Sequence, residues 1–155
     1  MRDGQEDRED LGRASEGEVA SRVTSGGEVG RTVSESRTVR SELVFPNDAN
    51  PTGNIFGGRV LMLMDVVAAI AARRHSRREV VTAEIDSVHF LRPIRVGECI
   101  EAIAEVSAVG HTSMEIEVRI VVEDLFTGAQ AEAASAYLTY VALDAVGRPT
   151  ASRAT

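Results

Sequence analysis

The chain has 155 residues, which is enough for one domain with a hydrophobic core and too few for two. Its formal charge of −7 argues against a general nucleic-acid-binding protein, whose surface would be basic. All 17 basic residues are arginine, and without lysine neither Schiff-base chemistry nor a phosphate-binding P-loop is possible. The single cysteine, Cys99, excludes an intrachain disulfide. It lies in an apolar strand pattern, which predicts a buried hydrophobic side chain and not a nucleophile.

Residues 1–37 differ in composition from the rest of the chain. They mix Asp, Glu, Arg, Gly and Ser, contain no aromatic residue and show no sustained hydrophobic period, which predicts a disordered acidic tail. The N-terminus lacks the cationic start and apolar core of a signal peptide, and no apolar run reaches the roughly 18 to 20 residues of a membrane span. We therefore expect a cytoplasmic protein that binds neither membrane nor nucleic acid.

Residues 38–146 show strand, loop and helix patterns that predict one domain. In chain order the predicted elements are a strand over 37–45, a loop over 46–56, a helix over 57–74, and strands over 79–90, 98–109, 111–123 and 131–143. One long apolar helix with five strands predicts an α+β fold in which an antiparallel five-stranded sheet wraps around a central helix. Residues 147–155 should form a flexible C-terminal end.

Asp65 is the only polar residue between positions 60 and 72 of the predicted helix. The helix is apolar nearly all the way round, so other structure should surround it. A carboxylate in such a setting loses hydration and needs a hydrogen-bonding partner. Carboxylates of this kind cluster at working sites, which makes Asp65 the first candidate for catalysis. The alternative is that the helix is rotated so that Asp65 simply faces water.

The same helix predicts a dimer. One five-stranded sheet cannot cover an apolar helix on every side, and the edge strands of the sheet expose unpaired backbone groups. Association of two copies, through their sheets or their helices, would satisfy both needs.

Three segments of the chain resemble the signature of the hotdog-fold acyl-CoA thioester hydrolases of the cytosolic type. They are PNDANPTGNIFGG at 46–58 followed by Asp65, VHFLRPI at 88–94 with VGE at 96–98, and YVALD at 140–144 with GRP at 147–149. The resemblance spans about residues 38–150. It implies the hotdog fold and hydrolysis of acyl-CoA to a free carboxylic acid and CoA, with no metal or redox cofactor.

The resemblance implies that Asp65 is the catalytic Asp and that Asn50 acts with it from the other subunit. Asp65 would serve as general base for water or, alternatively, attack directly and form an anhydride. Asn50 would position the water or polarise the carbonyl. The alternative for Asn50 is a loop residue whose side chain satisfies its own turn.

Gly57 and Gly58 lie at the predicted start of the helix, where their free N–H groups could stabilise a thioester oxyanion. The resemblance adds Asn54 to these substrate-binding residues. Asp65 lies seven to eight residues further on, about 11 Å along the helix axis. That distance is too great for one helix to place both Asp65 and these amides at one carbonyl carbon. An antiparallel helix of a second protomer would bring them together.

Two groups of residues are candidates for CoA binding. Arg73 and Arg74, with Arg77 and Arg78, could bind the phosphates in bidentate fashion, although a solvated helix end whose cations complement the dipole explains them as well. For the turn at Gly110, His111, Thr112 and Ser113, the resemblance suggests contacts to the pantetheine or nucleotide end of CoA.

The resemblance also implies an assembly: family members often form trimers of dimers, so we expect a homodimer as the minimal unit and a hexamer. Two other functions compete with hydrolysis. Hydration or dehydration of acyl thioesters usually needs a His paired with an acid, and His89 and His111 lack the helix-centred position of Asp65. A non-catalytic acyl-CoA-binding or structural hotdog protein would tolerate the loss of Asp65.

Overall fold

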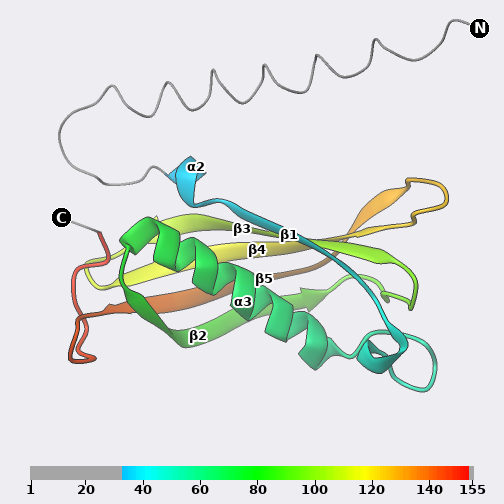
Figure 1. The fold of residues 1–155 in the computed structure, drawn as a ribbon, viewed down its shortest axis with the longest axis horizontal. Coiled ribbons are helices and arrows are strands. Elements are labelled where there is room, and N and C mark those ends of the chain that lie inside the picture. The colour runs from blue at the N-terminus through cyan, green and yellow to red at the C-terminus, as the bar shows by residue number, and fades with distance from the viewer. Residues whose placement is uncertain (1–32, 154–155) are drawn as a thin grey trace, which may run out of the picture.

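A five-stranded antiparallel sheet curls around one long helix (Figure 1). The structure is a computed structural model that describes residues 33–153, so residues 1–32 of the predicted tail lie outside it. The elements are α2 (Val33–Ser36), β1 (Thr38–Leu43), the 3-10 helix η1 (Pro46–Asp48), α3 (Gly57–Ser76), β2 (Glu79–Phe90), β3 (Cys99–Val109), β4 (Ser113–Glu123) and β5 (Gln130–Leu143). The arrangement confirms the predicted α+β hotdog fold.

The long helix α3 begins at the glycine pair and continues two residues beyond its predicted end. It stops where Arg77 adopts the left-handed conformation, with φ of 59°, and donates its N–H to the Arg73 carbonyl at 2.7 Å. Leu, Met and Ala, which fill most of the apolar run from 60 to 72, lose little side-chain freedom in a helical conformation. The five strands lie where the hydrophobic pattern places them, with bounds that differ by at most two residues at either end.

The strand order β1-β3-β4-β5-β2 leaves β1 and β2 at the two edges of the sheet. β2 pairs with β5 alone, and the pairing shifts register twice, between Thr82 and Glu84 and between Asp86 and His89. At the second shift Ser87 has a φ of 50°. Such bulges bend a strand, which lets β2 curve around α3, and no strand among residues 33–153 pairs with its outer edge.

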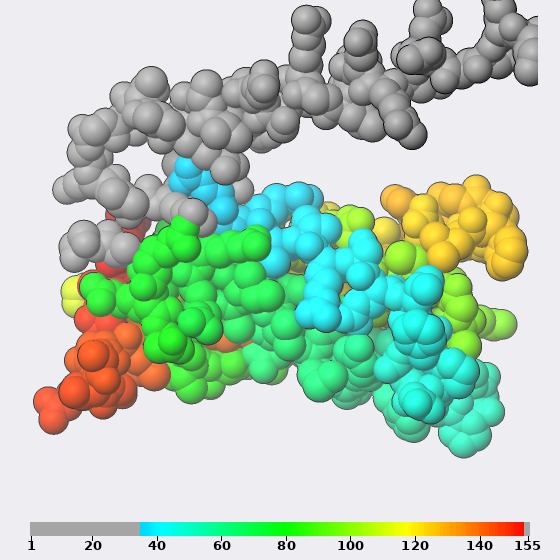
Figure 2. Space-filling view, in the orientation of Figure 1, coloured from blue at the N-terminus to red at the C-terminus, as the bar shows by residue number. Residues whose placement is uncertain are grey.

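The core lies between the concave face of the sheet and one side of α3. In β4 every second residue is buried, from Met114 to Val122, as the alternation predicts. On α3 the side toward the sheet is buried, whereas Met62 is 55% exposed and Val66 39% exposed on the outer side. In the space-filling view α3 and β2 lie on the face toward the viewer (Figure 2). The sheet therefore covers one side of the helix only, as expected.

The C-terminal residues fold back onto the sheet as far as the structure describes them. Thr150 donates its N–H to the Ala142 carbonyl at 2.9 Å, and Ser152 donates its N–H to the His111 carbonyl at 2.8 Å. Ser152 is fully buried, and its hydroxyl bonds the Gly110 carbonyl at 2.6 Å. Residues 147–153, which the sequence places in a flexible end, thus make ordered contacts here.

Between residues 33 and 153, no helix has the length and apolar character that crossing a membrane requires.

Candidate active site

Asp65 lies in the middle of α3, half-buried, and hydroxyl groups from two strands reach its carboxylate. The Thr82 hydroxyl of β2 donates to Asp65 Oδ1 at 2.8 Å. The Tyr140 hydroxyl of β5 donates to the same oxygen and lies 2.8 Å from the backbone carbonyl oxygen of Asp65. The helix is therefore not rotated so that Asp65 merely faces water. Its carboxylate is held at the boundary between helix and sheet.

The two donors come together because Thr82 and Tyr140 are directly opposed in the β2–β5 pairing. Burial, together with the hydrogen bond to Asp65, raises the pKa of Tyr140 far above its usual range, so the phenol stays protonated. We did not predict either residue as functional from the sequence. A threonine and a tyrosine are ordinary strand residues, and only the register of the sheet places them beside Asp65.

The start of α3 has free backbone donors. Phe56, which precedes the helix, supplies no side-chain cap, and Arg59 is the first helical residue whose N–H is bonded, to the Phe56 carbonyl. No residue between 33 and 153 accepts the Gly57 or Gly58 amide, and both lie at the positive end of the helix dipole. A cavity of about 440 Å³ opens beside them, lined by nine residues that include Asn54, Gly57 and Phe90. These are the features that bind an anion or a developing oxyanion.

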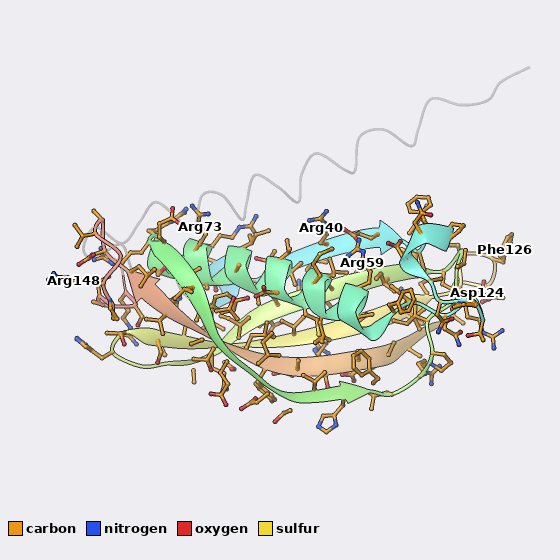
Figure 3. The ribbon with its side chains drawn as sticks, turned by 90° about the horizontal axis from the view of Figure 1, so that it is seen from below. Arg40, Arg59, Arg73, Asp124, Phe126 and Arg148 are labelled. Atoms are coloured by element: carbon orange, nitrogen blue, oxygen red, sulfur yellow. The ribbon has the colours of Figure 1, made fainter. Side chains whose placement is uncertain are left out.

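The loop before the helix is anchored to the helix by Arg59. The guanidinium pairs with Asp48 at 3.1 Å and with Glu42 of β1 at 2.8 Å. Figure 3 shows Arg59 and Arg40 on the side of α3 next to β1, with Arg73 further along the helix. The Phe45 amide, which donates to the Asp48 carboxylate, and then Arg59 lower the pKa of Asp48. The loop thus has a fixed conformation beside the free amides.

Asn50 uses its side-chain oxygen within its own loop. The Oδ1 atom accepts hydrogen bonds from the Thr52 amide at 3.0 Å, the Thr52 hydroxyl at 2.7 Å and the Asn54 amide at 3.1 Å. This is the turn-forming role that we considered as the alternative. These bonds do not use the Nδ2 group, which can still donate to a ligand.

One chain does not bring all predicted catalytic residues together. Within residues 33–153 no hydrogen bond joins Asn50 to Asp65. Gly57 and Asp65 are eight residues apart on one helix, about 12 Å along its axis. The structure groups Asp65 with Thr82 and Tyr140, and separately groups Asn50, Asn54 and the glycine pair at the helix start.

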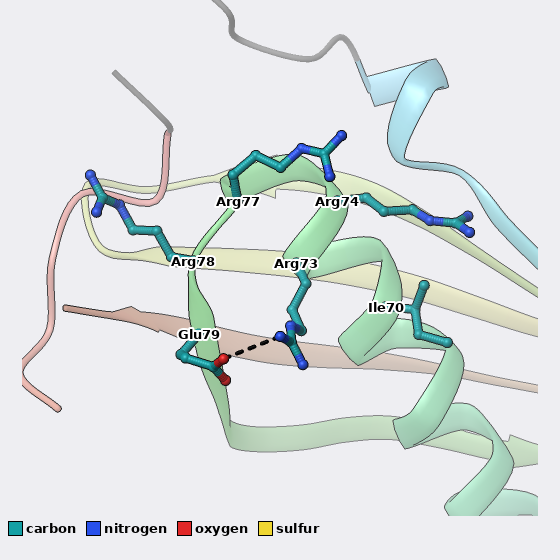
Figure 4. A pocket seen from close by; sticks show the side chains of 6 residues that line it. All are labelled: Ile70, Arg73, Arg74, Arg77, Arg78 and Glu79. Carbon is teal, nitrogen blue, oxygen red and sulfur yellow. Dashed lines mark hydrogen bonds and ion pairs between the residues drawn. The ribbon is translucent and has the colours of Figure 1, made fainter. Parts of the chain in front are cut away.

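The other end of α3 carries the predicted phosphate-binding arginines. Arg73, Arg74, Arg77 and Arg78 line an open cavity of about 550 Å³ together with Ile70 and Glu79 (Figure 4). Some of their donors bond the protein: Arg73 pairs with Glu79 at 3.1 Å, Arg74 with the Thr38 hydroxyl at 3.1 Å, and Arg78 with the Ala151 carbonyl at 3.0 Å.

His75 belongs to the same helix end but does not add to its charge. Its side chain is buried, and its ring nitrogens have no partner in the described part of the chain. Burial, and then the nearby charge of Arg153, lower the pKa of His75, so the ring is neutral at pH 7.

The turn from Gly110 to Ser113 lies at the arginine end of the sheet, because its Thr112 carbonyl accepts the Ala142 amide and Ala142 pairs with Val80. The carbonyls of residues 110 and 111 also accept hydrogen bonds, both from Ser152. The Ser113 carbonyl accepts the Gly110 N–H at 2.8 Å, so all four carbonyls of the turn are bonded.

Titratable groups could also supply a metal site or a reactive thiol. Residues 33–153 contain no group of three or more His, Cys, Asp or Glu side chains that could hold a metal ion. Burial, and then the charges of Glu123 and Glu101, raise the pKa of the Cys99 thiol, which keeps it protonated and unreactive.

Comparisons with known proteins agree with the fold and with the resemblance in the motifs. Residues 52–128 match the thioesterase superfamily. The chain is 44% identical over 119 residues to the "uncharacterized acyl-CoA thioester hydrolase YkhA" of Bacillus subtilis, covering 77% of this chain and 69% of that protein. It is 38% identical over 120 residues to the cytosolic acyl coenzyme A thioester hydrolase of Rattus norvegicus, and spans about a third (32%) of that protein's length.

Solved structures give the same result. An acyl-CoA hydrolase from Staphylococcus aureus, in complex with butyryl-CoA, CoA and CoA disulfide, has a TM-score of 0.76 and 42% identity, covering 78% of this chain and 74% of that chain. Three alanine variants of the S. aureus enzyme, at an Asp, a Thr and an Asn, also match. An apo-hexameric acyl-CoA thioesterase has a TM-score of 0.76 and 42% identity, covering 78% of each chain.

An antiparallel sheet around one helix that carries a held carboxylate defines a hotdog-fold thioester hydrolase. The chain belongs to the thioesterase superfamily, as a member of the acyl-CoA thioester hydrolase family.

Proposed function

We propose that this protein hydrolyses acyl-CoA to a free carboxylic acid and CoA, with Asp65 activating water at a site that two protomers share. The observation that carries the proposal is the placement of Asp65, whose Oδ1 is bonded by Thr82 and Tyr140 while all other residues of α3 from 60 to 72 are apolar. A carboxylate held in this way can accept a proton from water without changing its own position.

The S. aureus structures support the choice of residues. The Asn, Asp and Thr that were replaced by alanine in that enzyme follow one another at intervals of fifteen and seventeen residues. Asn50, Asp65 and Thr82 have the same two intervals. Two independent intervals would rarely agree by chance, so these three residues are the natural counterparts.

The proposed reaction begins with water between Asp65 and the thioester carbonyl carbon. Asp65 takes a proton as the water oxygen attacks, and the amides of Gly57 and Gly58 from the partner subunit stabilise the oxyanion. The Nδ2 group of Asn50, from the same partner, holds the water or polarises the carbonyl. When the C–S bond breaks, the proton on Asp65 passes to the leaving thiolate of CoA. The steps need no metal or redox cofactor.

The shared site requires a dimer, and the chain has an exposed surface suited to a dimer interface. β2 is a twelve-residue edge strand whose outer edge is unpaired, and Val81 and Ile85 are exposed on it. The exposed Met62 and Val66 lie on the adjacent outer side of α3. Antiparallel pairing of two β2 strands about a two-fold axis would join the sheets and set the helices side by side, start to end. The hexameric relatives support a hexamer built from such dimers.

The remaining assignments concern CoA and the cell. We place the CoA phosphates at Arg73 and Arg74, because guanidinium groups line the open cavity there. We place a further part of CoA at the turn from Gly110 to Ser113, which lies at the same end of the sheet. We also place the protein in the cytoplasm, as the name of the cytosolic rat relative suggests.

The test of the function is release of free thiol from a series of acyl-CoAs of graded chain length. We expect turnover with at least one of them, with saturation kinetics. If CoA and acyl-CoA bind tightly in calorimetry but no thiol is released from any of them, the protein is a non-catalytic acyl-CoA-binding protein and the proposal is wrong.

Gly58 provides a test of the helix start. A Cβ atom at this position would meet nothing within 4 Å in the chain, and alanine favours a helix over glycine by about 0.5–1 kcal/mol. We expect Gly58→Ala to leave the melting temperature unchanged or raised, yet to lower kcat/KM about tenfold or more because the methyl group blocks close approach of the thioester. Melting curves and kinetics check both parts. Unchanged kinetics would remove Gly58 from the oxyanion site.

A further inference from the structure

The two hydrogen bonds to Asp65 meet at a single oxygen atom. Thr82 Oγ1 and the Tyr140 hydroxyl both donate to Oδ1, and no partner for Oδ2 is found among residues 33–153. Both donors rise from the sheet, so Oδ1 is turned toward the sheet and Oδ2 toward the outer surface of α3. The carboxylate thus has one oxygen that is held and one that is free.

We propose that Tyr140 is a positioning residue for thioester hydrolysis: its hydroxyl, together with that of Thr82, holds Asp65 by Oδ1 and leaves Oδ2 to take the proton from water. This inference rests on the proposed function, because it assigns roles to the two oxygens of the proposed general base.

The direction of the Tyr140 hydrogen bond follows from proton counting. The hydroxyl has one proton and three polar neighbours: Asp65 Oδ1, the Asp65 carbonyl oxygen at 2.8 Å and the Thr82 hydroxyl. The charged carboxylate oxygen attracts the proton more strongly than the neutral carbonyl oxygen does. Because burial raises the pKa of the phenol far above its usual range, the group remains a donor at neutral pH.

The environment of Asp65 suits a base. Its partners are neutral hydroxyls, and in the described part of the chain no arginine forms an ion pair with it. The two hydroxyls on Oδ1 fix the rotation of the side chain and occupy that oxygen. Oδ2 is therefore the oxygen that no described residue binds and that water can reach in the proposed reaction.

The Tyr140 side chain is held firmly enough to position Asp65. It is 1% exposed, and its strand lies between β4 and β2, where it pairs with Met114 on one side and Thr82 on the other. The bulge between Thr82 and Glu84 begins immediately beyond this pair. Bulges often re-aim a side chain beside an active site, which explains why β2 departs from regular pairing here.

The test is Tyr140→Phe, which removes only the hydroxyl. Because Tyr140→Phe removes a hydrogen bond to a charged group, we expect kcat to fall about ten- to a hundredfold, with KM unchanged. The acid limb of the pH–rate profile should move to higher pH, because a carboxylate that loses a donor binds its proton more tightly. The matched control is Tyr137→Phe, which alters the other tyrosine of the chain, on the opposite face of β5, and should leave kcat and the pH profile unchanged.

Two further measurements distinguish a positioning role of Tyr140 from a role in the folding stability of the protein. In an Asp65→Ala background, Tyr140→Phe should lower the residual activity no further, because Tyr140 acts through Asp65. Ring-fluorinated tyrosine, introduced into the Tyr137→Phe chain, makes the Tyr140 hydroxyl a stronger donor without changing the fold. It should move the acid limb to lower pH. The measurement with fluorinated tyrosine tests the inference even if Tyr140→Phe folds poorly.

The outcomes distinguish this inference from the proposed function. If Asp65→Ala abolishes turnover while Tyr140→Phe behaves as wild type, Tyr140 is not a positioning residue and the function stands. If Tyr140→Phe lowers activity by the same factor in the wild-type and Asp65→Ala backgrounds, Tyr140 is likewise not a positioning residue and the function stands. If the wild-type protein releases no thiol from any acyl-CoA, the function itself fails.

Discussion

We expect Asp65→Asn to lower kcat for acyl-CoA hydrolysis by about a hundredfold or more, the usual contribution of a general base. Asparagine keeps an oxygen that can accept the hydrogen bonds from Thr82 and Tyr140, so the helix and the sheet should remain in place. What it loses is the free oxygen that takes a proton. The expected result is therefore a protein with nearly the wild-type melting temperature that binds CoA but releases almost no thiol.

The matched control is Glu117→Gln, which neutralises a carboxylate on the face of β4 turned away from α3. It changes the charge of the chain by the same amount, and we expect it to leave kcat unchanged. Activity of Asp65→Asn within a few-fold of wild type would show that another group activates the water, and the assignment of Asp65 would be wrong.

Single-turnover hydrolysis in heavy-oxygen water decides how Asp65 acts. If Asp65 is a general base, the label enters only the carboxylic acid product. If Asp65 attacks the thioester and forms an anhydride, hydrolysis of the anhydride places the label in Asp65 itself. Mass spectrometry of the peptide that contains Asp65 distinguishes the two.

The position of Asp65 was predictable from the sequence because a carboxylate in an apolar helix is an exception to a local pattern. The strands were predictable because the alternation of apolar and polar residues is itself a local pattern, as in β4 from Met114 to Val122. The roles of Thr82 and Tyr140 were not. They depend on the pairing of strands fifty-eight residues apart in the chain, and no local pattern records which residues face each other across a sheet.

Asn50 shows a different limit of prediction from the sequence. Its turn-forming role and its proposed catalytic role appeared as alternatives in the sequence, yet the structure separates them by atom: Oδ1 holds the loop, and Nδ2 remains for a ligand. The loop geometry thus shows the turn-forming role and leaves the catalytic role of Asn50 as a prediction. The excess of apolar surface on α3 was visible in the sequence, and we propose that a second chain covers it.

Mixing two inactive variants should restore activity, and this is the strongest test of the shared site. Asn50→Ala and Asp65→Ala are each expected to be nearly inactive. In a mixed dimer, Asp65 from one protomer and Asn50 from the other form one intact site, while the second site carries both substitutions. With random assembly, half of the dimers are mixed, so co-refolded protein should regain about a quarter of wild-type turnover.

The matched control mixes Asp65→Ala with Thr82→Val. Thr82 bonds Asp65 within one chain, so every site of a mixed dimer lacks one of the two, and the mixture should be no more active than its components. Restoration in the first mixture and not in the second requires that Asn50 and Asp65 meet across the interface while Thr82 and Asp65 do not. No restoration in either mixture, despite mixed dimers detected by native mass spectrometry, would place the whole site within one chain and remove the need for the antiparallel helices.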